Sequence, residues 1–152
     1  MTTGSDNLSE DIRSLRLLRV ESLTLGVPDE MILAISDWTE PAPLPFAPPS
    51  VLGIVSMHGR MFTVVDVAAL LARKAATQSR SIVALRGDEQ LALAVDEPLE
   101  VVSVKPDEVV NETETDLIQG TIRLNGEQVL LLDVDSLFAG IIRGRERRRR
   151  RL

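Results

Sequence analysis

The chain has 152 residues, a net charge of −6 and no cysteine. This length suits one domain, or two small domains that share a core. The missing cysteine excludes disulfides, thiolate metal sites and cysteine nucleophiles. Because no apolar run is long enough to span a membrane and the N-terminus is too polar for a signal peptide, we expect a soluble cytoplasmic protein.

Charge is divided sharply between the body of the chain and its last ten residues. The segment RGRERRRRRL at 143–152 has seven arginines and one glutamate, a local charge of +6, so residues 1–142 carry −12. Such a tail is a solvated terminus, lies on the chain's own acidic body, or binds a polyanion. The candidate residues for binding nucleic acid or an anionic membrane are Arg143, Arg145, Arg147, Arg148, Arg149, Arg150 and Arg151.

The first half of the chain begins with strand patterns. A polar segment at 1–14 is expected to be flexible, and strands are predicted at 15–20 and 22–27. The apolar run at 31–36 is too short for its periodicity to distinguish helix from strand. Residues 39–50 contain five prolines, which predicts an extended connector outside any sheet interior.

The next segment has the pattern of a β-hairpin followed by a helix. Strands are predicted at 53–57 and 61–66, and the His-Gly pair at 58–59 forms the turn because glycine readily adopts a positive φ. Asp66 stands where an N-cap belongs, ahead of a short helix at 67–73.

The second half of the chain continues the strand patterns. Strands are predicted at 81–86, 91–96 and 99–104, and a charged loop at 105–116 follows them. A second hairpin with its own capped helix occupies 118–138.

This second hairpin repeats the first at a spacing of 67 residues without a gap. Asp133 matches Asp66, and the turn glycines match as well. The similarity between the two copies extends over residues 15–71 and 82–138. An internal repeat indicates how the whole chain is organised, so it is considered before other features. Two copies of a short unit with many strands predict two small β-barrels or sheets packed together, since closed sheets leave few free edges.

With strands, proline connector, glycine hairpin and capping aspartate in this order, the chain resembles the CheW-like family of chemotaxis coupling proteins. The most specific part is LPFAPPSVLGIVSMHGRMFTVVDVAALL, which is similar to the family's proline-bearing lead-in, hairpin and short helix. LALAVDEPLEVVSV is similar to the second family signature, and LIQGTIRLNGEQVLLLDVDSLF to the closing hairpin. The resemblance implies an all-β fold over residues 15–142, with two intertwined five-stranded SH3-like β-barrels and short capping helices.

The same resemblance implies a non-enzymatic adaptor in a bacterial chemosensory complex. Such a protein links a CheA-like histidine kinase to a chemoreceptor tip, through strand edges and apolar patches on the barrels. Trp38 has two interpretations, an interface anchor or a plug between the barrels. The candidate partner-binding residues are Ile32, Ile35, Trp38, Ile54, Met57, His58, Arg60, Met61 and Phe62.

Three positions depart from the family pattern. His58 replaces an arginine, Thr63 a proline and Ala34 a glutamate. The arginine and the glutamate belong to the receptor-facing region of the family. Kinase binding is therefore the stronger of the two partner predictions.

The sequence contains few residues that could support catalysis. Ser56, His58 and Asp66 lie close in sequence, but a triad needs all three side chains to converge, and His58 precedes a turn glycine. With one histidine, no cysteine and no glycine-rich phosphate loop, we expect no metal, no cofactor and no catalysis. The alternative to the adaptor is an SH3-like binding module whose arginine tail engages nucleic acid or anionic membrane.

Overall fold

The computed structural model describes residues 13–72, 79–111, 115–137, 139 and 141. The predicted flexible segment lies almost wholly outside these residues, and the arginine tail lies entirely outside them. The first strand begins at Arg13, two residues earlier than the repeat pattern predicts.

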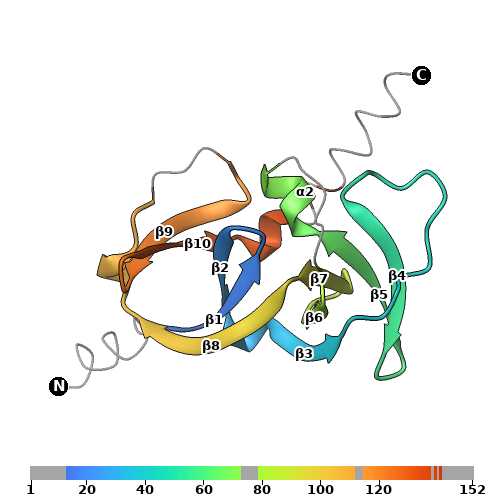
Figure 1. Cartoon of the computed structure of the whole chain (residues 1–152), viewed down its shortest axis with the longest axis horizontal. Coiled ribbons are helices and arrows are strands. Elements are labelled where there is room, and N and C mark those ends of the chain that lie inside the picture. Colours follow the sequence, from blue (N-terminus) through green and yellow to red (C-terminus); the bar gives the residue numbers. More distant parts are fainter. Residues whose placement is uncertain (1–12, 73–78, 112–114, 138, 140, 142–152) are drawn as a thin grey trace.

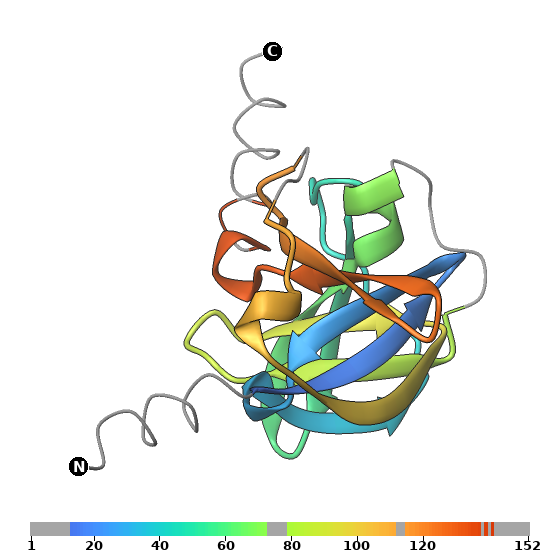
Figure 2. The ribbon, with the colours of Figure 1, turned by 90° about the vertical axis from the view of Figure 1, so that its left-hand side faces the viewer.

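The chain forms two five-stranded sheets, and each of them is curled (Figure 1). We call the barrel formed by the first sheet the first barrel, and it faces the viewer in Figure 2. In spatial order its strands are β8 (Glu97–Val104), β1 (Arg13–Val20), β2 (Leu23–Pro28), β10 (Glu127–Leu132) and β9 (Ile118–Leu124).

The second barrel is built on the same plan. Its strands, again in spatial order, are β3 (Ile32–Asp37), β6 (Ser81–Leu85), β7 (Leu91–Val95), β5 (Arg60–Asp66) and β4 (Val51–Met57). The short helix α2 (Val67–Ala72) follows β5, and residues 134–137 are helical after β10. Two 3₁₀ turns, Asp29–Met31 and Pro106–Glu108, precede β3 and follow β8.

Neither repeat copy forms a barrel alone. The first copy gives β1 and β2 to the first barrel and β3, β4 and β5 to the second, while the second copy gives β6 and β7 to the second barrel and the remaining strands to the first. The two sheets have the same strand order when each strand is replaced by its repeat counterpart. The run at 31–36, which periodicity could not assign, is therefore a strand, as its counterpart β8 is.

The matching glycines follow from a close approach of the backbone in each barrel. Ala42 of the proline connector forms an isolated bridge with Ile54, and a Cβ at Gly53 would collide with the Ala42 carbonyl. In the other barrel a Cβ at Gly120 would lie 3.0 Å from the carbonyl oxygen of Val110. Only glycine lets the two backbones approach this closely.

Three apolar clusters hold the molecule together. One fills each barrel, and the third, which includes Leu18, Leu93 and Leu132, lies between the two barrels. The central strand β7 contributes to two of these clusters. Its alanines face the interior of the second barrel, and its leucines face the cluster between the barrels. A strand with both faces covered is apolar throughout, as this one is.

Candidate partner-binding surface

The β4–β5 hairpin carries most of the predicted partner-binding residues, and its register decides which of them reach solvent. Directly paired residues share a face, and faces alternate along a strand. Ser56 pairs with Met61, and this pair points outward. Val55 pairs with Phe62, and this pair points into the second barrel.

Phe62 and Met57, two of the candidate partner-binding residues, therefore face the interior of the second barrel. Phe62 is 2% exposed and belongs to the same buried cluster as Ala84 and Ala92. Met57 is buried in the same cluster. The apolar character of these residues could not reveal their direction, because the sequence around Phe62 is apolar on both faces.

Outward residues are also found on β3, an edge strand of the same sheet. The Ser36 hydroxyl of β3 lies 4.0 Å from the Met57 sulfur of β4, so the two edge strands of the second sheet meet at this point. Ile35, next to Ser36, points outward and is 38% exposed. Met61 is 56% exposed. We call the outward candidate residues of β3 and of the β4–β5 hairpin the seam surface: Ile35, Ile54, His58, Arg60 and Met61.

Two predicted residues on or next to β3 serve mainly the core. Ile32 is half-buried and packs against the cluster between the barrels. Trp38 is also half-buried, and it packs against the interior cluster of the second barrel. Its side chain therefore belongs to the interior of that barrel and not to the cluster between the barrels.

The hairpin turn excludes a catalytic triad. His58 and Gly59 have φ values of 52° and 75°, as a two-residue turn with both φ values positive requires. Asp66 lies at the end of β5 that is farther from the turn. A strand rises by about 3.3 Å per residue, which puts Asp66 roughly 20 Å from the hairpin turn. Its carboxylate accepts a hydrogen bond from the Ala69 N–H at 3.2 Å and caps α2. Within the described ranges, no three acidic or histidine side chains are grouped to hold a metal ion.

Sequence reasoning missed two features, Phe46 in the proline connector and a cavity at the end of the first barrel. The Phe46 side chain is 94% exposed, and its backbone has a φ of 61°. The only signal in the sequence was a phenylalanine between the Leu44-Pro45 pair and a second proline cluster. The cavity left no sequence signal, because its walls come from five separate segments.

None of the helices in the described part of the chain is long and apolar enough to cross a membrane.

Comparison with known proteins gives a consistent family. The family model named CheW-like domain matches residues 15–141 of this chain. A chemotaxis protein CheW from Rhizobium meliloti (strain 1021) is 28% identical over 148 residues, which cover 91% of this chain and 95% of the relative. A probable chemotaxis protein CheW from Rhizobium etli is 22% identical, with coverage of 91% and 96%.

A solved structure supports the same fold. The scaffolding protein TtCheW from Thermoanaerobacter tengcongensis superimposes with a TM-score of 0.71 at 15% identity, and the match covers 80% of this chain and 88% of that one. The predicted all-β fold with two five-stranded barrels is confirmed.

Proposed function

This chain belongs to the CheW-like family, whose members are scaffold and adaptor proteins and not enzymes, and on that premise we propose which partners it joins. It holds a CheA-like histidine kinase close to a chemoreceptor in the cytoplasm. The observation that carries the proposal is the seam surface, where Ile35 and Met61 expose apolar side chains on the second barrel.

The seam surface suits a protein partner for physical reasons. Apolar side chains exposed on a rigid sheet lose little conformational freedom on binding, and their burial drives association. Arg60 and His58, both exposed at the hairpin tip, supply a polar rim beside the apolar centre. An apolar centre with a polar rim is the usual anatomy of a protein interface.

The departures from the family pattern shape the partner that fits. Ala34 faces the interior of the second barrel with Ala84, its paired residue. A glutamate at that position would place a charge at the barrel interior or at its edge, whereas alanine leaves the strand apolar. At His58 a permanent guanidinium is replaced by an imidazole. Because Ala34 faces inward, only His58 changes the charge that a partner meets on the seam surface.

The proposal is tested by capture of partners from the native cytoplasm. Full-length protein, residues 1–142 and the Met61→Asp variant are immobilised in parallel, and the retained proteins are identified. We expect the kinase with residues 1–152 and 1–142 alike, and much less of it with the variant. A kinase retained by none of the three would contradict the adaptor role. Lipid or nucleic acid held only by the full-length chain would instead favour the alternative role of the arginine tail.

A further inference from the structure

A groove lined with carboxylates lies where the chain crosses from the first barrel to the second. It has a volume of about 680 Å³. Most of its lining comes from residues 28–31, which join β2 to β3, and from residues 132–135, which join β10 to the helix that follows. We call it the acidic groove, after the four carboxylates in its lining, those of Asp29, Glu30, Asp133 and Asp135.

These carboxylates have few cations beside them. Arg13 is the only cation in the lining among the described residues. Asp29 has a loose ion pair, with 3.6 Å between its Oδ1 and Arg16 Nε. Glu30 and Asp135 are exposed, and their side chains form no ion pair with another described residue. Because like charges around one groove repel each other, the groove favours a ligand with several positive charges.

Apolar side chains line the same groove. Leu132 is buried, and Met31 and Val134 are partly buried and pack against the cluster between the barrels. Arginine suits such a lining, because its aliphatic stem covers apolar surface while its guanidinium binds a carboxylate through two hydrogen bonds. The acidic groove therefore favours an arginine-rich segment over a simple cation.

The chain itself contains such a segment close to the groove. Residues 143–152 include seven arginines. They follow a helix that begins at Val134 in the groove lining and is anchored by Leu137 and Ile141, which are buried in the cluster between the barrels. A helix rises by about 1.5 Å per residue, which puts Ile141 roughly 11 Å from Val134. Ten extended residues reach about 33 Å, so the arginine segment is long enough to return to the groove.

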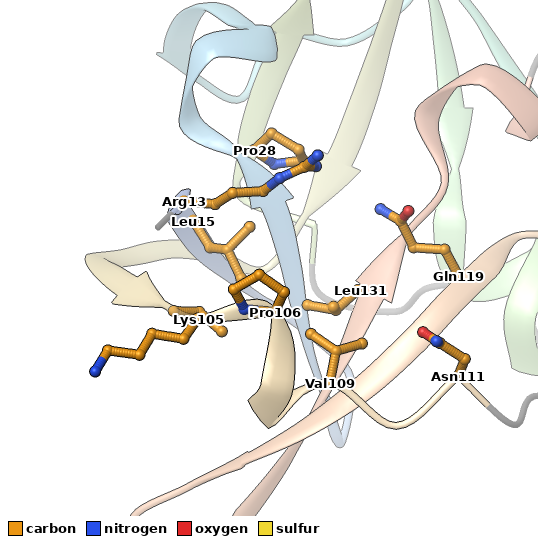
Figure 3. Close-up of a pocket in the computed structure, with 10 residues that line it drawn as sticks. Arg13, Leu15, Pro28, Lys105, Pro106, Val109, Asn111, Gln119 and Leu131 are labelled. Atoms are coloured by element: carbon orange, nitrogen blue, oxygen red, sulfur yellow. The ribbon is translucent and has the colours of Figure 1, made fainter. Parts of the chain in front are cut away.

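A neighbouring cavity has the opposite charge. The cavity at the end of the first barrel has a volume of about 350 Å³ and shares Arg13, Pro28 and Gln119 with the acidic groove. Figure 3 shows the polar ends of Arg13 and Gln119 turned toward that cavity from opposite sides. Its charged lining residues are Arg13 and Lys105, and among the described residues no carboxylate lines it. An arginine segment is therefore attracted to the acidic groove and repelled by the cavity.

We propose that the arginine segment 143–152 binds in the acidic groove of its own chain. Its guanidinium groups pair with Glu30 and Asp135, and its aliphatic stems cover Met31 and Val134. Attachment to the same chain gives the segment an effective concentration on the order of millimolar, so the groove competes well with external polyanions. The bound segment is withheld from nucleic acid and anionic membranes. This contact is separate from the seam surface and does not depend on the kinase.

A labelled peptide of residues 143–152 tests the groove directly. The peptide is titrated at low salt with the full-length chain and with chain 1–142, which retains every described residue, and fluorescence anisotropy reports binding. We expect saturable binding to chain 1–142. Binding to the full-length chain should be roughly tenfold or more weaker, because its own segment occupies the groove. High salt should weaken binding to both chains, because it screens the charges.

Two charge-reversed variants separate the groove from the general acidity of the chain. Glu30→Lys combined with Asp135→Lys changes the groove. Asp37→Lys combined with Glu40→Lys is the matched control, because it changes the net charge equally at exposed positions at and beyond the far end of β3. In chain 1–142 the groove variant should bind the peptide roughly tenfold or more weakly, and the control should bind it much more tightly than the groove variant does. Thermal unfolding checks that every variant is folded.

In the full-length chain the groove variant should release the arginine segment. Labelled heparin serves as the polyanion probe, and the groove variant should bind it more tightly than the control variant, although the two have the same net charge. Equal heparin affinity of the two folded variants would overturn the proposal. So would a peptide that does not bind folded chain 1–142, or one that binds the groove and control variants equally.

Discussion

Asp66 and Asp133 make the same two hydrogen bonds in the two halves of the molecule. Each donates its N–H to the carbonyl of a residue before the hairpin, Ser50 or Leu117, at 2.7 Å. Each accepts, through Oδ1, the N–H of the third residue of the helix that follows, at 3.2 Å. The two aspartates therefore join a hairpin to its helix in both barrels.

Replacing either aspartate should lower the stability of the fold. Asp66→Ala and Asp133→Ala are each expected to lower the free energy of unfolding by about 1 kcal/mol, the usual cost of losing an N-cap. Asp66→Asn should lose less, because its amide oxygen still accepts the Ala69 N–H. Urea denaturation measures all three variants, and a neutral effect of both alanine variants would contradict the capping role.

Phe62 and its neighbour Met61 should respond in opposite ways to substitution. Phe62→Ala opens a cavity in the second barrel and is expected to cost about 3–5 kcal/mol of stability. Met61→Asp changes an exposed residue and should alter stability by no more than about 0.5 kcal/mol. Thermal and urea unfolding of the two variants provide the comparison. A small loss at Phe62 together with a large loss at Met61 would mean that the register of the hairpin is wrong.

Phe46→Asn should stabilise the fold. The exposed ring contributes almost nothing to the core, and asparagine tolerates the positive φ at this position, so we expect a gain of about 1 kcal/mol in the free energy of unfolding. Phe46→Leu, which keeps a bulky side chain at the same φ, is the matched control and should give no gain. Equal stability of all three proteins would show that the backbone here carries no strain.

Asp96 and Glu127 should give stability opposite dependences on pH. Burial raises the pKa of Asp96 above its ordinary value of 3.8, against the hydrogen bond that it accepts from the Glu21 N–H and the nearby charges of Arg19 and Arg80. Hydrogen bonds from Thr24 and Arg19 lower the pKa of Glu127 below its ordinary value of 4.5.

The signs follow from proton linkage. The raised pKa makes ionised Asp96 a penalty on folding at neutral pH, and this penalty fades as the pH falls through the folded pKa toward 3.8. Asp96→Asn should therefore stabilise at pH 7 and lose this advantage near pH 4. Glu127 stabilises above 4.5 and loses its contribution as the pH falls through its lowered pKa, so Glu127→Gln should destabilise at pH 7 and become neutral in acid. Urea midpoints of both variants from pH 3 to pH 7 measure the difference.

The repeat, the turns and the capping residues could be predicted because each depends on the types of residues that lie close together in the sequence. The positive φ of Gly59 and Gly126 and the capping by Asp66 and Asp133 follow from residue types at fixed offsets. The exchange of strands between copies could not be predicted from the residues, since it depends on pairings such as that of β5 with β7, which are distant in sequence. That part of the expectation came from the family resemblance.

The candidate surface was predicted less well than the fold. Of the candidate residues, Met61 and Ile35 are exposed, whereas Phe62 and Met57 face inward, because hairpin register alone decides the direction of apolar neighbours. The exposure of Phe46 could not be read from a proline-rich segment, since prolines predict an extended connector but not which side chain it presents.

The most direct test of the adaptor role is a calorimetric titration of the purified full-length chain into the CheW-like regulatory domain of the CheA-like kinase from the same organism. We expect saturable binding by the wild type and a loss of about tenfold or more in affinity for Met61→Asp. Gln128→Asp is the matched control, because Gln128 is the exposed counterpart of Met61 on the first barrel, and it should bind like the wild type. Absence of binding by the folded wild type, or equal affinity of Met61→Asp and the wild type, would contradict binding through the seam surface.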